Sequence, residues 1–163
     1  HRAVLGLRPV RAAVAVVLRD GFDIGSSVDE GGDMADVTPC PCGGMPAGAA
    51  FAECCGPALR GEVWPETAEA LMRSRYTAFA LRHDDHLFRT WHPRTRPADP
   101  SADRVTTWTG LEIEEVAGGG PEDEEGTVTF TARFRDAMAQ GRMHEKSRFV
   151  RRAGRWMYLE PIE

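Results

Sequence analysis

The sequence predicts an α+β domain that is preceded by a small cysteine-rich segment. Apolar residues recur at helical spacing over residues 68–82, and beyond residue 110 they alternate with polar residues. Helices followed by a run of alternating strands are typical of the α+β class. All four cysteines lie between Cys40 and Cys55, in a stretch too short to bury a core of its own.

Two helices are predicted first. The first covers residues 68–82, with Thr67 as its N-cap. Its apolar face is expected to carry Met72, Tyr76, Phe79 and Ala80. Asp84 or Asp85 is expected to cap the second helix, which would bury Leu87, Phe88 and Trp91. The proline-rich residues 92–103 then predict a loop.

Four antiparallel strands are predicted to follow as a meander. The first contains Leu111 and Ile113, and the others cover residues 128–134, 143–150 and 155–159. The predicted turns are residues 116–126, residues 136–141 and the Ala153-Gly154 pair. Trp91, Trp108 and Trp156 are expected to lie in the core.

The overall composition limits the class of function. The net charge is −5, which argues against a large nucleic-acid-binding surface. No apolar run is long enough to span a membrane, and residues 10–21 lack the features of a signal peptide, so a cytoplasmic protein is expected. Residues 1–33 are expected to be a disordered extension, because residues 20–33 are rich in Gly, Ser and Asp. The alternative is a short strand at residues 14–18 that packs on the body.

The cysteines predict a metal site. Cys40 and Cys42 lie in one turn and Cys54 and Cys55 in a second, and four such thiolates can surround a zinc ion. Metal binding would supply the folding energy of this segment, whereas the sheet domain has its own core. Two disulfides or free thiols are the alternatives, and a reducing compartment disfavours disulfides. Because Cys54 and Cys55 are adjacent, one of these ligands could be replaced.

Several segments resemble known families. The segment "CPCGG…ECCG" resembles the SEC-C zinc motif, which is named for the C-terminal tail of the SecA translocation motor. The segments "EALMRSRYTAFALRHDDHLFRTWHPRTRP", "WTGLEI", "EGTVTFTARF" and "HEKSRFVRRAGRWMYLE" resemble the bacterial YchJ family of uncharacterised proteins. The resemblance implies a SEC-C motif with structural zinc at residues 34–60. It also implies a nuclear transport factor 2-like domain at residues 61–163, with helices wrapped on a curved antiparallel sheet that forms a cone.

A polar cluster is predicted inside this cone. Glu145 and Ser147 share a strand face with Phe149, opposite a helix that carries two arginines. The remaining members of the candidate pocket are Arg73, Arg75, Tyr76 and His92. The functional interpretation is a small-molecule site with Glu145 as base or anchor. The structural interpretation is an Arg–Glu bridge between helix and sheet, with His92 as a loop-fixing hydrogen bonder.

Two function hypotheses follow. The first is a zinc-containing adaptor or binding module that recruits a protein partner. The second is a small lyase or isomerase that acts on a small molecule in the cone. No nucleophile or cofactor motif separate from the cysteine segment is present. His83, His86 and His144 lack ligand-like spacing and are expected at the surface.

Overall fold

The structure is a computed structural model that describes residues 38–100 and 106–163. The short helical turns η3 (Phe51–Glu53) and α2 (Gly56–Leu59) precede the helices α3 (Ala68–Leu81) and α4 (Asp84–Thr90). The strands β2 (Thr107–Gly118), β3 (Glu125–Arg135), β4 (Gln140–Arg152) and β5 (Arg155–Pro161) follow. This order confirms the α+β class. The predicted extension, residues 1–33, lies outside the described residues.

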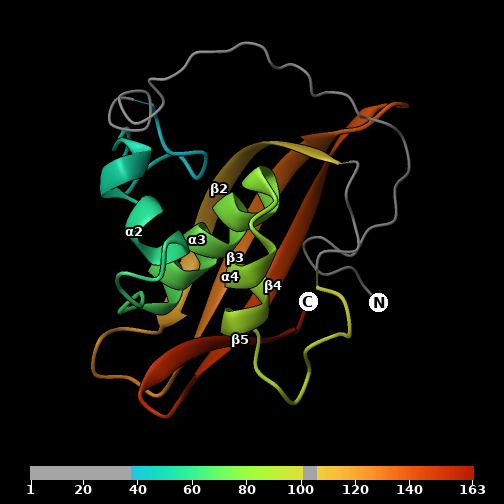
Figure 1. Cartoon of the computed structure of the whole chain (residues 1–163). Helices are drawn as coiled ribbons and strands as arrows, with labels where there is room; N and C mark the ends of the chain where they lie inside the picture. Colours follow the sequence, from blue (N-terminus) through green and yellow to red (C-terminus); the bar gives the residue numbers. More distant parts are fainter. Residues whose placement is uncertain (1–37, 101–105) are drawn as a thin grey trace.

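Helix α3 has the predicted start and apolar face. The Thr67 side chain accepts a hydrogen bond from the Ala70 backbone N at 3.0 Å, so the predicted N-cap is confirmed. The helix ends at Leu81 because Arg82 adopts the left-handed conformation, with φ of 60°. Leu71, Met72, Tyr76 and Phe79 are buried. Helix α3 lies against the concave side of the sheet and contacts β2, β3 and β5 (Figure 1).

Helix α4 differs from the prediction in two respects. Its N-cap is His83, and Asp84 and Asp85 instead occupy the first turn, where carboxylates interact favourably with the helix dipole. Phe88 is 46% exposed, so its predicted burial is wrong. The Arg96 guanidinium covers the Phe88 ring at 3.8 Å from the centroid. Leu87 and Trp91 are buried, as predicted.

The sheet has four strands in the order β2-β3-β4-β5, all antiparallel. Val128, Phe130 and Ala132 on β3 are fully buried, while the threonines between them face the other side. The predicted turn at residues 116–126 is too long. Val116 pairs with Val128, and β2 continues to Gly118.

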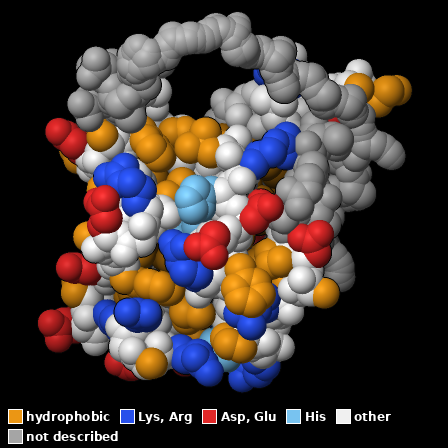
Figure 2. Space-filling model, in the orientation of Figure 1, with side chains coloured by type: hydrophobic (Ala, Val, Ile, Leu, Met, Phe, Trp, Pro, Cys, Tyr) orange, Lys and Arg blue, Asp and Glu red, His pale blue; other side chains and the backbone are white. Residues whose placement is uncertain are grey.

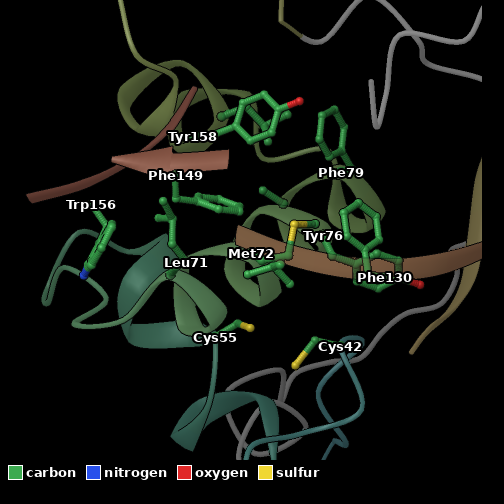
Figure 3. Packing of buried hydrophobic residues seen from close by; sticks show 14 of the residues in the cluster. Cys42, Cys55, Leu71, Met72, Tyr76, Phe79, Phe130, Phe149, Trp156 and Tyr158 are labelled. Atoms are coloured by element: carbon green, nitrogen blue, oxygen red, sulfur yellow. The ribbon is translucent and has the colours of Figure 1, made fainter. Parts of the chain in front are cut away.

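One hydrophobic core joins the helices, the sheet and the cysteine segment. Leu71, Met72 and Tyr76 on α3 belong to one buried cluster with Phe130 and Phe149 of the sheet and with Trp156 and Tyr158 of β5 (Figure 3). Cys40, Cys42, Cys55 and Leu59 belong to the same buried cluster. The cysteine segment therefore packs on α3 instead of forming a separate, tethered knuckle.

The surface shown in Figure 2 mixes acidic, basic and hydrophobic side chains over the helices, and neither sign of charge dominates this face. Among the described helices, none has the length and apolar character needed to cross a membrane.

Candidate metal centre

Two turns bring the cysteines together. Backbone hydrogen bonds from Cys40 N to Ala49 O (3.1 Å) and from Phe51 N to Thr38 O (2.7 Å) fold residues 38–51 back on themselves. The turn after Cys42 requires Gly44, whose φ is +90° and at which a Cβ atom would lie 2.4 Å from Ala49 N. The turn η3 then returns the chain to Cys54 and Cys55.

The four sulfur atoms have the spacing of a metal site. All lie within 4.8 Å of one another, with Cys42 Sγ 3.6 Å from Cys54 Sγ and 4.0 Å between the sulfurs of Cys54 and Cys55. Zn–S bonds of about 2.3 Å place the sulfurs of a tetrahedron about 3.8 Å apart. A disulfide needs about 2.05 Å. The adjacent cysteines thus both reach the cluster, and the donor set fits zinc.

Electrostatics within the cluster favours a bound cation. Burial, together with the charges of Cys42 and Cys40, raises the pKa of Cys54 to about 12. Hydrogen bonds with Cys40 and Cys42 raise the pKa of Cys55, whereas hydrogen bonds from Cys42 and Cys55 lower that of Cys40. Four neighbouring thiolates repel one another, so all four thiols can ionise only if a positive charge lies among them. A divalent cation supplies this charge and displaces the thiol protons.

Helix α3 contributes two hydrogen-bond donors to the cysteine turns, Arg73 and Thr77. The Arg73 Nη1 donates to Cys42 O at 2.9 Å and lies 3.7 Å from Cys42 Sγ. The Thr77 hydroxyl donates to Cys55 Sγ at 3.3 Å, and Gly44 N donates to Cys42 Sγ at 3.3 Å. Donors of this kind orient thiolate ligands and stabilise their charge. Arg73 and Thr77 belong to the body of the domain, so the cluster is tied to α3.

The predicted polar cluster in the cone is only partly assembled. Glu145 is 2% exposed, and its Oε2 accepts hydrogen bonds from Ser147 Oγ at 2.5 Å and Tyr158 OH at 3.0 Å. The Arg75 guanidinium is fully buried and lies 4.5 Å from the Tyr158 ring centroid. It donates to Thr90 Oγ1 at 2.9 Å. Burial lowers the pKa of Arg75 to about 10, while the charges of Tyr158 and Glu145 oppose this effect. Arg75 therefore remains charged at neutral pH.

The other three predicted members lie elsewhere. Arg73 is two residues from Arg75, which turns it to the opposite side of α3, where it bonds Glu69 Oε2 at 2.9 Å. Tyr76 packs edge-on against Trp108, with 6.3 Å between the ring centroids. His92 Nδ1 accepts from Arg94 N at 3.0 Å, which matches its expected loop-fixing role.

His86 is buried, so its predicted surface position is wrong. Its Nε2 lies 2.8 Å from Ser74 Oγ, and its Nδ1 lies 3.2 Å from Arg89 Nη2. Because arginine can only donate, Nδ1 accepts and the proton sits on Nε2. Burial and the charges of Arg75 and Arg89 lower the pKa of His86 to about 3. The imidazole is neutral and donates to Ser74, whose hydroxyl donates to Leu71 O. It therefore cannot act as a base toward this serine.

A cavity of about 300 Å³ adjoins the cysteine cluster. It lies between the cysteine segment, α3 and the chain that precedes α3. Its apolar walls are Met45, Ala58, Val63, Trp64, Pro65 and Ala70. No sequence pattern predicts this site. Val63 and Trp64 lie in a short stretch with neither helical nor alternating periodicity, so no local pattern marks it.

Buried tyrosines predict an alkaline transition. The chain has two tyrosines; burial raises the pKa of Tyr76 to about 12, and burial and Glu145 raise that of Tyr158 well above its usual value. Unfolded tyrosines ionise near pH 10, so above that pH the folded state holds more protons and stability falls as pH rises. The lowered pKa of Arg75 makes stability rise with pH, but it concerns one group, whereas the two tyrosines both make stability fall.

Tyrosinate absorbance is therefore expected to appear together with the loss of circular dichroism, above about pH 10. An exposed surface tyrosine would instead ionise in the folded state. Ionisation of either tyrosine near pH 10 with the dichroism intact would contradict the burial of that ring.

Comparison with known proteins agrees with these features. Residues 67–161 match the family described as "YchJ, middle NTF2-like domain". A UPF0225 protein of Streptomyces coelicolor is 48% identical over 122 residues, which cover 75% of this chain and 93% of that protein. A UPF0225 protein of Chromobacterium violaceum is 47% identical over 127 residues, with 76% and 91% covered.

Two solved structures have the same fold. The solution structure of a SEC-C motif containing protein from Rhodopseudomonas palustris is 34% identical, with a TM-score of 0.67 and coverage of 77% of this chain and 98% of that one. The crystal structure of a SEC-C motif containing protein from Psychrobacter arcticus is 26% identical, with a TM-score of 0.65 and coverage of 78% and 84%. The α+β body is therefore NTF2-like, as the resemblance implied, and the chain belongs to the YchJ family.

Proposed function

We propose that this chain is a zinc-binding adaptor, in which a structural zinc ion holds the cysteine segment against an NTF2-like body to form a protein-binding surface. The observation that carries the proposal is the sulfur cluster, whose spacings of 3.6 and 4.0 Å match a tetrahedral zinc site. Cys40, Cys42, Cys54 and Cys55 would hold the ion. Bound zinc would cross-link the two turns. Both structural relatives are described as SEC-C motif containing proteins, which supports this assignment.

The interior of the domain favours a binding module over an enzyme. The Glu145 carboxylate accepts from Ser147 and Tyr158, and the charge of Arg75 lies close enough to interact with it. Phe130, Phe149 and other buried side chains of the hydrophobic core lie in the same interior. In the described part of the chain, no observation specifically favours the lyase or isomerase hypothesis. A cavity instead opens beside the cysteine cluster.

Metal analysis tests the first half of the proposal. Protein purified without added metal is expected to contain one zinc ion per chain, and Cys42→Ser to contain much less. A metal content far below one equivalent, with two disulfides detected by mass spectrometry, would contradict the zinc assignment.

Site-specific cross-linking tests the second half. A photo-reactive residue at Val63, beside the cavity, is expected to capture a defined protein in cells, and the same residue at the exposed Met138 is not. Capture should also fail when Cys42→Ser removes the metal. An identical set of captured proteins at both positions would contradict a partner-binding surface beside the cysteines.

The donors Arg73 and Thr77 of α3 are expected to control metal affinity. Arg73→Met and Thr77→Val remove a donor from Cys42 and Cys55, respectively, without changing any ligand. Loss of such donors typically weakens metal binding by about 10- to 100-fold. Competition with a chromophoric chelator measures this change, with Arg133→Met at an exposed position as control. Unchanged zinc affinity in both variants would show that α3 does not support the metal site.

A further inference from the structure

We propose that the cavity beside the cysteine cluster binds a peptide segment of a partner protein in which a large apolar side chain lies next to a lysine or arginine. This inference rests on the proposed adaptor function and assigns the chemistry of the partner. It is carried by three properties of the cavity: its apolar walls, the fixed position of Trp64, and the charge at its rim.

The walls suit an apolar side chain. Met45, Trp64 and Pro65 line the cavity, and its volume of about 300 Å³ exceeds that of a single side chain. Val63 is 55% exposed and Met45 is 41% exposed, so both present apolar surface to an incoming group. Burying such surface against a partner is favourable, and exposed apolar patches of this kind mark binding sites.

The main aromatic wall is held in place before any ligand arrives. Trp64 Nε1 donates to Trp156 O at 2.9 Å, and Trp156 Nε1 donates back to Glu66 O at 3.0 Å. The Arg155 guanidinium lies 4.6 Å from the Trp64 ring centroid. Because these contacts fix the indole, a ligand would not have to order it, which lowers the entropic cost of binding.

The rim is acidic. Glu53 and Glu66 line the cavity and are exposed, and within the described residues neither carboxylate forms an ion pair. The charge of Arg73, which also lines the cavity, is compensated by Glu69 at 2.9 Å. Thiolates that hold zinc would add further negative charge beside Cys54. A positive side chain next to the apolar anchor complements this rim.

Peptide selection tests the assignment. The zinc-loaded full chain is used to select from a phage-displayed library of random heptapeptides, and the enriched peptide is synthesised with a fluorescent label. The expected consensus is an aromatic or large aliphatic residue next to Lys or Arg. Binding should weaken as salt is added, because exposed charges are screened.

Variants locate the binding site. Ala70→Phe fills the cavity and Val63→Asp places a charge at its apolar rim, and each is expected to weaken peptide binding at least ten-fold. Glu53→Gln and Glu66→Gln should weaken it several-fold and reduce its salt dependence. Met138→Ser and Glu115→Gln, at exposed positions outside the cavity lining, are the matched controls. The zinc content and melting temperature of each variant separate loss of binding from loss of folding.

Several outcomes would overturn the inference. These are the absence of any enriched peptide, a consensus without a basic residue, and binding that Val63→Asp leaves intact. Self-association of the chain that Val63→Asp abolishes would assign the cavity to a second copy instead. A fully zinc-loaded protein that cross-links a partner at Val63 but selects no such peptide would leave the adaptor function standing and reject only this partner chemistry.

Discussion

Replacing Cys55 by serine is expected to release the zinc ion and to lower the melting temperature of the whole chain by about 10 °C or more. The reason is that Cys55 and Leu59 are each 3% exposed and belong to the same hydrophobic core as α3. Loss of the metal would detach the cysteine segment from α3 and expose one side of Met72 and its neighbours. Burial of one such aliphatic side chain contributes about 1.5–3 kcal/mol. One kcal/mol shifts the melting temperature of a domain of this size by several degrees.

A chelator provides the matched experiment. Metal removal from the natural chain should reproduce the shift caused by Cys55→Ser, and the variant itself should no longer respond to the chelator. Calorimetry should show a single transition in the zinc-loaded protein, because the cysteine segment and the sheet share one core. An unchanged main transition beside a separate, chelator-sensitive one would show that the cysteine segment folds independently.

The sequence predicted the features that local chemistry determines. Thr67 and the helical spacing of Met72 and Tyr76 mark α3, because a cap and an apolar face require only neighbouring residues. The cysteines stood out because thiols rarely gather in one window without a chemical role. Their placement within 4.8 Å of one another agrees with that interpretation.

The features that tertiary packing determines were missed or wrongly assigned. Phe88 follows Leu87 on a short helix, and only one of them can face the core; the sequence does not show that Arg96 will cover the other. The burial of His86 depends on Ser74 of α3, twelve residues earlier in the chain. Both contacts join different elements, and single-sequence periodicity carries no information about them.

The polar cluster illustrates the same limit. Strand alternation placed Glu145 and Ser147 on the inner face, and both are buried. Alternation does not show which of two nearby arginines faces the strand, nor that Tyr158 completes the cluster by donating to Glu145. Arg73 and Arg75 differ by about 200° around the helix axis. Arg75 turns toward the sheet because it lies three residues from Met72 and four from Phe79, on the apolar face of α3.

Glu145→Ala is expected to destabilise the domain by about 3–5 kcal/mol, because it removes the acceptor of two buried hydroxyls and an anion near buried Arg75. Chemical denaturation measures this loss. Glu160→Ala is the control. Glu160 lies 3.9 Å from Arg148, both side chains are about 40% exposed, and such surface pairs contribute under about 1 kcal/mol.

A second pair of variants separates charge from hydrogen bonding. Glu145→Gln keeps an oxygen that can accept from Ser147 and Tyr158 but loses the charge, so an intermediate loss is expected. Arg75→Met alone should be destabilising because it removes the cation near Glu145. Its combination with Glu145→Gln should cost less than the sum of the two single losses, since the neutral amide needs no cation and its oxygen still accepts from Ser147 and Tyr158. A loss below about 1 kcal/mol in Glu145→Ala would contradict a structural role for this carboxylate. Increased stability in Glu145→Gln would instead indicate strain retained for function, and would favour the lyase or isomerase hypothesis over a purely structural cluster.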